Sequence, residues 1–150
     1  MAEISPVPDG FTAVTPHLAV KGCSDAIDFY GKAFGAKDEM RMPTPGNEDI
    51  LMHARISIDG AMIMLVDATE EWGNDEPLKL GGSPVTIHLY TPDCDALYEQ
   101  AVEAGCDGKM APETMFWGDR FAHVVDPFGH HWTLATRVSD PAAEELNEAA

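Results

Sequence analysis

The chain carries the same sequence unit twice, and this repeat constrains its fold more than any other feature. Asp25-Ala26 and Gly35 recur as Asp95-Ala96 and Gly105, an offset of 70 residues. A short apolar run with one histidine precedes each copy, and a strand-like run ending in Asp and Gly follows it. A duplication of this kind builds two similar half-sheets that pack together. We therefore expect paired side chains on either side of one cleft, and function in that cleft.

Charge and cysteine content narrow the function classes. The 150 residues include 26 acidic and 9 basic side chains, a formal net charge of −17. Such a charge argues against nucleic acid and anionic membranes as partners. The three cysteines form no CxxC pair, and the sequence shows neither a leader pattern nor an apolar run of ~18 residues. We expect a soluble protein in the reducing cytoplasm.

Local patterns predict an α+β fold of two βαβββ modules. The first module covers residues 12–68 and the second residues 84–138, with a glycine- and proline-containing linker at 69–83. Residues 1–11 carry no pattern and are expected to be a flexible N-terminus. Residues 139–150 are expected to form an acidic C-terminal tail with a short, frayed helix.

Caps and turns predict the element boundaries. Ser24 is an N-cap candidate for the first helix, and Gly35 is expected to close it in a left-handed conformation. Asp59-Gly60 predicts a hairpin turn. In the second module either Asp93 or Asp95 opens the helix.

Several motifs resemble the vicinal oxygen chelate superfamily, the glyoxalase/bleomycin resistance/extradiol dioxygenase-like proteins. They are Phe29-Tyr30 in the first helix, Phe34-Gly35-Ala36 at its end and Asp126-Pro127-Phe128-Gly129 near the finish. The stretch 115–120, read with 126–132, is similar to the phosphonate-operon-type branch. The resemblance implies curved mixed sheets around a cleft that holds a small-molecule ligand, and a homodimer. It leaves the reaction open, because one such fold supports many chemistries.

The resemblance also implies where a metal would sit. In metal-using members, the first and last strands of each module supply four ligands to a divalent cation. Counted from the turn glycines and helix starts, these positions fall at Thr15, Met64, Thr86 and Thr133. Threonine hydroxyls and a thioether are poor ligands for such a cation. We therefore expect no cofactor and no metal at the usual site.

Three histidines keep a second interpretation open. His17 and His88 lie two residues beyond Thr15 and Thr86, and His131 lies two before Thr133, so each shares a face with its neighbour. One interpretation makes His17 and His88 buried, hydrogen-bonded residues of the cleft. The other is a shifted three-histidine site for a divalent metal such as Zn, Ni, Mn or Fe.

Further candidates surround these positions. Arg55 is either a surface residue or the partner of an anion, and Phe116 and Trp117 form either a lid or an interface. His53 alternates with Arg55, and Phe121 with His123, without showing which face they occupy. The full expected cleft comprises Thr15, His17, Arg55, Met64, Thr86, His88, Phe116, Trp117, Arg120, His131 and Thr133.

Three function hypotheses follow. The first is a metal-free protein that binds a small, partly aromatic or oxygenated molecule in the cleft. The second is a metal-dependent lyase, isomerase or dioxygenase at the shifted histidine site. The third is an enzyme without metal, in which His17 or His88 acts as general base and Arg55 or Arg120 holds an anionic substrate.

Overall fold

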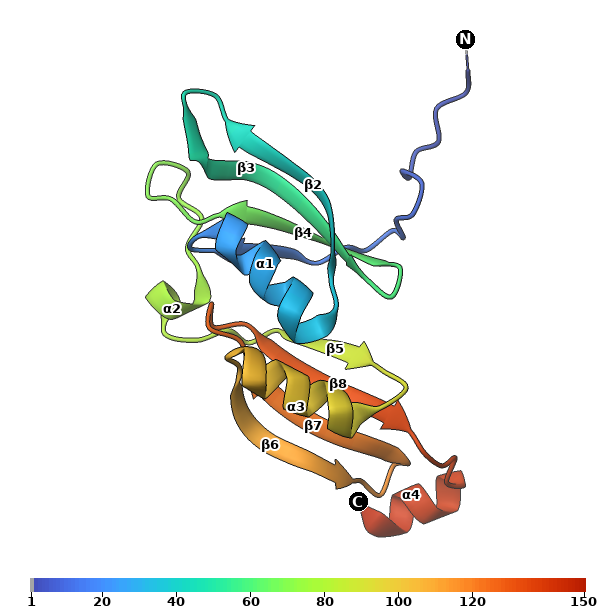
Figure 1. Ribbon diagram of the computed structural model, residues 1–150. Coiled ribbons are helices and arrows are strands. Elements are labelled where there is room, and N and C mark those ends of the chain that lie inside the picture. Colours follow the sequence, from blue (N-terminus) through green and yellow to red (C-terminus); the bar gives the residue numbers. More distant parts are fainter. Residues whose placement is uncertain (1) are drawn as a thin grey trace. The chain divides into compact units, whose positions relative to one another are not determined.

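The computed structural model describes residues 2–150 and divides the chain into two compact units, residues 1–80 and 81–150. We call these the first and the second module and describe each by itself (Figure 1). Each contains a four-stranded mixed sheet and one long helix. The predicted α+β fold with two βαβββ modules is confirmed.

The first module follows the predicted order of strand, helix and three strands. Its sheet has the order β1-β4-β3-β2, with β1 parallel to β4 and the other pairs antiparallel. A single turn of helix, α2 (Pro77–Leu80), ends the module. The main elements are β1 (His17–Val20), α1 (Cys23–Phe34), β2 (Lys37–Thr44), β3 (Asn47–Ile58) and β4 (Ala61–Asp67).

The second module repeats this arrangement with the sheet order β5-β8-β7-β6. Its parallel pair is β5 with β8. A further helix, α4 (Ala143–Ala149), lies in the C-terminal tail. The main elements are β5 (Thr86–Tyr90), α3 (Cys94–Ala104), β6 (Asp107–Thr114), β7 (Asp119–Val125) and β8 (His131–Arg137).

Each core lies between one face of a sheet and its helix, α1 or α3 (Figure 1). Strand side chains alternate between faces, and the buried apolar residues follow that alternation. In the first module Leu18, Ile56 and Leu65 lie under the buried stripe of α1 that contains Tyr30. In the second module the fully buried core includes Val124, Trp132 and Leu134.

The Asp-Pro-Phe-Gly motif builds the turn between β7 and β8. The Asp126 carboxylate accepts hydrogen bonds from the backbone N–H groups of Phe128 and His130, at 2.9 and 3.0 Å. Its second oxygen accepts the indole N–H of Trp132 at 2.8 Å. One buried carboxylate therefore ties the turn to the largest side chain of the core.

The structure corrects the predicted start of the first helix. Ser24 lies inside α1 and is not its N-cap, because the helix begins at Cys23. The Asp67 carboxylate, at the end of β4, instead accepts hydrogen bonds from the backbone N–H groups of Gly22 and Cys23. Gly35 closes α1 with a φ of 70°, as predicted.

The three cysteines are free and buried. Burial raises the pKa of the Cys23 and Cys106 thiols to about 12, and it also raises the pKa of Cys94. Within residues 2–150, no helix has the length and apolar character needed to span a membrane.

Candidate functional site

The candidate site lies on the helix-free face of each sheet, by which we mean the face opposite α1 or α3. Along each strand, the half-buried or exposed side chains of this face alternate with the buried core residues of the opposite face. Strand register aligns one row of side chains across each sheet. The rows are His17–Met64–Arg55–Met40 in the first module and His88–Thr133–His123–Met110 in the second.

These rows show how the first strand of each module pairs with the last. Counting back from the helix starts had placed first-strand ligands at Thr15 and Thr86, and counting from the turn glycines had placed last-strand ligands at Met64 and Thr133. The ladder pairs Met64 with His17 and Thr133 with His88, two residues further along. Thr15 precedes β1, and Thr86 lies opposite His131. The two histidines, and not the threonines, are therefore level with Met64 and Thr133 in the sheets.

In the first module, two imidazoles and an arginine gather on the helix-free face. The rings of His17 and His53 meet edge to face, with centroids 5.8 Å apart. The guanidinium carbon of Arg55 lies 5.7 Å from the centre of the Phe11 ring, within the range of a cation–π contact. Partial burial lowers the pKa of His53, and the neighbouring His17 and Arg55 lower it further.

In the second module, the histidines bind one another and a threonine. His88 Nδ1 lies 2.7 Å from the Thr133 hydroxyl. His123 Nε2 and His131 Nδ1 share a hydrogen bond of 3.0 Å. Partial burial lowers the pKa of His123, and the charges of His131 and Lys109 act in the same direction. A shared hydrogen bond needs one ring nitrogen to accept, so it favours at least one neutral imidazole.

Aromatic rings continue from this histidine cluster into the loop before β7. His88 contacts Tyr90 and Phe121, with ring centroids 4.6 and 6.1 Å apart. Trp117 meets Phe121 edge to face at 5.5 Å, and Phe116 meets Trp117 at 5.1 Å. The Trp117 indole N–H donates to Asp119. We call Tyr90, Phe121, Phe116 and Trp117 the aromatic run. Tyr90 is 62% exposed and Phe116 48% exposed.

The donors on these faces do not fit the superfamily's usual metal. The first strand of each module contributes an imidazole, that of His17 or His88. The residue opposite it on the last strand offers only the thioether of Met64 or the hydroxyl of Thr133. His131 and His123 already bind each other. Taken module by module within residues 2–150, no three His, Cys, Asp or Glu side chains converge as metal ligands. We therefore derive no reaction step through a metal.

Arg120 does not join the helix-free face of the second sheet. It forms a two-pronged ion pair with Asp95 at the start of α3, at 2.9 and 3.0 Å. The carboxylate beside it in sequence, Asp119, binds Trp117 instead. Arg120 therefore joins α3 to β7, and its charge is already paired.

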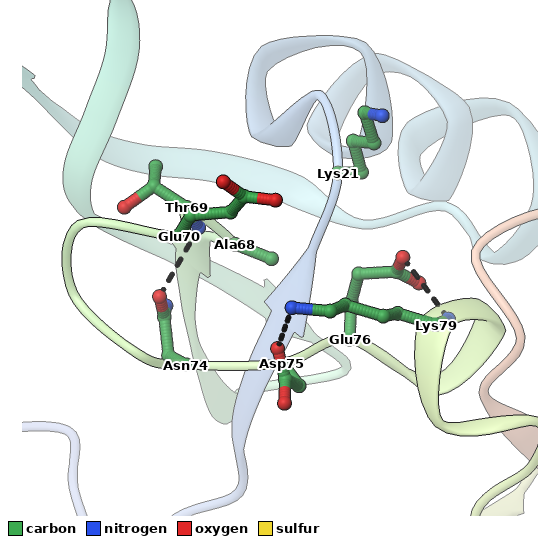
Figure 2. A pocket seen from close by; sticks show the side chains of 8 residues that line it. All are labelled: Lys21, Ala68, Thr69, Glu70, Asn74, Asp75, Glu76 and Lys79. Carbon is green, nitrogen blue, oxygen red and sulfur yellow. Dashed lines mark hydrogen bonds and ion pairs between the residues drawn. The ribbon is translucent and has the colours of Figure 1, made fainter.

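A polar hollow of about 290 Å³ lies elsewhere in the first module, beside α2 (Figure 2). Several of its groups are paired with one another: Lys79 binds Asp75 at 2.6 Å, and Asn74 accepts from the Thr69 backbone at 3.1 Å. The buried Glu76 accepts from the first N–H groups of α2. These contacts explain the hollow as a structural feature of the connection to the second module.

Sequence reasoning missed Phe11 and Tyr90. Phe11 was assigned to the flexible N-terminus, and only its contact with Arg55 reveals its position. Tyr90 lies two residues beyond His88 on the same strand, so period-2 alternation would have placed it on the same face. Alternation along the sequence had not shown which face of the sheet four other residues occupy. In the structure His53, Arg55, Phe121 and His123 all lie on helix-free faces.

Comparisons with known proteins agree with this architecture. The sequence model of the Glyoxalase/Bleomycin resistance protein/Dioxygenase superfamily matches residues 11–134. An uncharacterized protein of Mycobacterium tuberculosis strain H37Rv is 42% identical over 140 residues, which are 91% of this chain and 81% of that protein. The X-ray structure of an Arabidopsis thaliana gene product has a TM-score of 0.66 and 28% identity, covering 83% of this chain and 98% of that one. A PhnB protein from Bacillus cereus has a TM-score of 0.63 at 16% identity, covering 83% and 99%.

Proposed function

Because the chain belongs to the glyoxalase/bleomycin resistance protein/dioxygenase superfamily, we propose that it binds a small, partly aromatic or oxygenated molecule without the superfamily's usual metal. We place binding on the helix-free faces of the sheets, each considered within its own module. The observation that carries this proposal is the aromatic run, which is exposed yet internally packed. Exposed aromatic surface of this kind is typical of ligand-binding faces, because flat rings stack there at little entropic cost.

The methionines of the first sheet support the same ligand class. Met64 and Met40 flank Arg55 in the ladder, and Met62 lies on the same face as Met64. Thioether side chains are polarizable and adapt to irregular apolar ligands. The helix-free faces thus offer aromatic and thioether surface, with few charged groups among them.

The indole N–H signals of an isotope-labelled protein test this proposal by NMR. Aromatic fragments should shift the Trp117 indole signal, because that ring belongs to the aromatic run. The Trp132 indole is buried and bound to Asp126, so its signal should stay in place and serve as an internal control. Trp117→Phe should weaken binding of the aromatic fragments. Trp72→Phe, in the loop beside the polar hollow, should leave that binding unchanged. Fragments that shift only Trp72, or equal weakening by both variants, would contradict the proposal.

One observation favours a second candidate, a metal-dependent lyase, isomerase or dioxygenase. His17 and His88 occupy the first-strand rows level with Met64 and Thr133, where the superfamily resemblance implies ligands. This candidate requires stoichiometric Zn, Ni, Mn or Fe after dialysis, measured by elemental analysis. It also requires His17→Ala, His88→Ala and His131→Ala each to reduce metal uptake. Retained metal with that dependence would replace the metal-free proposal.

A further inference from the structure

Every other arginine of the chain has a carboxylate partner, whereas Arg55 has none among the described residues of the first module. Arg41 pairs with Asp28 and Asp38, and the remaining two arginines pair as Arg120–Asp95 and Arg137–Asp140. Acidic side chains outnumber basic ones by 26 to 9, so carboxylates are abundant. Within the described part of the first module, residues 2–80, none forms an ion pair with Arg55.

The Arg55 side chain is also partly desolvated. Its residue is half-buried, and its Nε atom is buried without a hydrogen-bond partner. A buried charged donor without a partner is costly, by more than a neutral one. Buried polar groups are otherwise nearly always paired, and an exception suggests a missing ligand or ion. The guanidinium thus lacks an acceptor for its Nε–H within the described part of the first module.

The groups around Arg55 suit an organic anion. The Phe11 ring lies against the guanidinium of Arg55, whose carbon is 5.7 Å from the ring centre. Met64 and Met40 are its ladder neighbours and supply apolar surface on both sides. Glu39, next to Met40 in β2, already accepts the Ser57 hydroxyl at 2.6 Å. In the second module the equivalent row position is occupied by His123, whose imidazole is either neutral or cationic. A permanent positive charge at this position is therefore found in the first module only.

We infer that Arg55 is a subsite for a carboxylate group on a small molecule bound at the helix-free face of the first module. The inference rests on the proposed function and deepens it: the ligand is an aromatic carboxylic acid rather than a neutral aromatic. The planar guanidinium fork matches a carboxylate in a bidentate pair, which a lysine would not reproduce. Phe11 and the two methionines then contact the carbon skeleton beside the carboxylate.

Indoleacetate and indoleacetamide form a matched pair of probes for this subsite. They share one ring system and differ in charge at one end. We expect the full-length protein to bind indoleacetate about tenfold more tightly than the amide, because charge-assisted hydrogen bonds are about twice as strong as neutral ones. The acid should also shift the Arg55 Nε–Hε signal in NMR spectra. By pairing with the positive charge of the nearby guanidinium, the acid should raise the apparent pKa of His53.

Variants of Arg55 distinguish the contribution of the bidentate guanidinium geometry from that of its positive charge. Arg55→Gln should remove the preference for the acid, and Arg55→Lys should restore only part of it. Arg137→Gln is the matched control, since it removes the same charge from an exposed, ion-paired position, and it should keep the preference. If Arg55→Gln does not fold, the ratio of acid to amide in the unchanged protein and the Arg55 signal still decide the matter.

The outcomes distinguish this inference from the proposal it rests on. Equal affinity for acid and amide, with Trp117 shifted by both, overturns the carboxylate subsite and leaves the proposed function in place. An Arg55 signal that stays unmoved at ~10 mM indoleacetate also overturns the subsite. If aromatic fragments in general leave both Trp117 and Arg55 unmoved, the proposed function and the subsite fall together.

Discussion

Asp67 shows how one buried carboxylate organises the first module. It is 2% exposed and accepts three backbone N–H groups, those of Gly22, Cys23 and Leu51, at 3.0, 2.9 and 2.7 Å. The first two belong to the start of α1 and the third to β3. One side chain at the end of β4 therefore joins three elements and replaces the missing cap of α1.

We predict that Asp67→Ala lowers the free energy of unfolding by about 3 kcal/mol, because two buried N–H groups and one partly buried N–H group lose their acceptor. Asp67→Asn should cost less, since one carbonyl oxygen remains as an acceptor. Chemical denaturation followed by circular dichroism measures both changes. Asp49→Ala, at an exposed position of β3, is the control and should change the unfolding free energy by less than ~0.5 kcal/mol. A similar loss in both alanine variants would contradict this role of Asp67.

The sequence could not reveal the role of Asp67, because its partners lie 16 to 45 residues away in the chain. Ser24 looked like the cap because capping residues are recognised by local position. In the structure its hydroxyl is bound by Arg41 instead. Local signals found the glycines that end the helices and the Asp59-Gly60 turn, whose residues both have positive φ. Long-range hydrogen bonds to helix starts carry no such local signal.

The two long helices begin in different ways, although the modules repeat. Helix α3 has a side-chain cap of its own: Asp93 accepts from the Ala96 N–H at 3.0 Å. We predict that Asp93→Ala lowers the free energy of unfolding by about 1 kcal/mol, the usual cost of losing an N-cap. Glu99→Ala, in the exposed middle of α3, should be nearly neutral. The same denaturation measurement compares them, and an unchanged stability of Asp93→Ala would rule out the cap.

The first strands show where prediction from the sequence failed at the site. The first module was expected to begin at residue 12, but its first strand, β1, begins at His17, and β5 begins at Thr86. The apolar alternation of Thr12–Val20 suits a strand, yet pairing with β4 ends with His17 opposite Met64. Register in a parallel pair depends on the partner strand, which counting along one strand cannot supply. The sequence therefore identified His17 and His88 as candidates, but it did not show which residues of the neighbouring strand lie opposite them.

Across residues 2–150, two half-buried histidines have lowered pKa values, one in each module. Partial burial is the main cause for both His53 and His123. In the unfolded chain an imidazole titrates near pH 6.5, above its value in the fold. Between the two values the unfolded chain binds more protons, so the free energy of unfolding falls as the pH falls. The stabilising contribution is complete above about pH 6.5 and is lost as the pH drops through the lower, folded values.

We predict that this loss appears between about pH 7 and pH 5 in denaturant unfolding, and that His53→Gln with His123→Gln makes the profile flatter. The net charge of −17 acts in the opposite direction, because acidification relieves repulsion among carboxylates. Measuring both proteins at ~0.5 M salt screens that repulsion. The difference between the two profiles then belongs to the histidines alone. Parallel profiles for the double variant and the unchanged protein would show that neither imidazole is destabilised in its charged form by the fold.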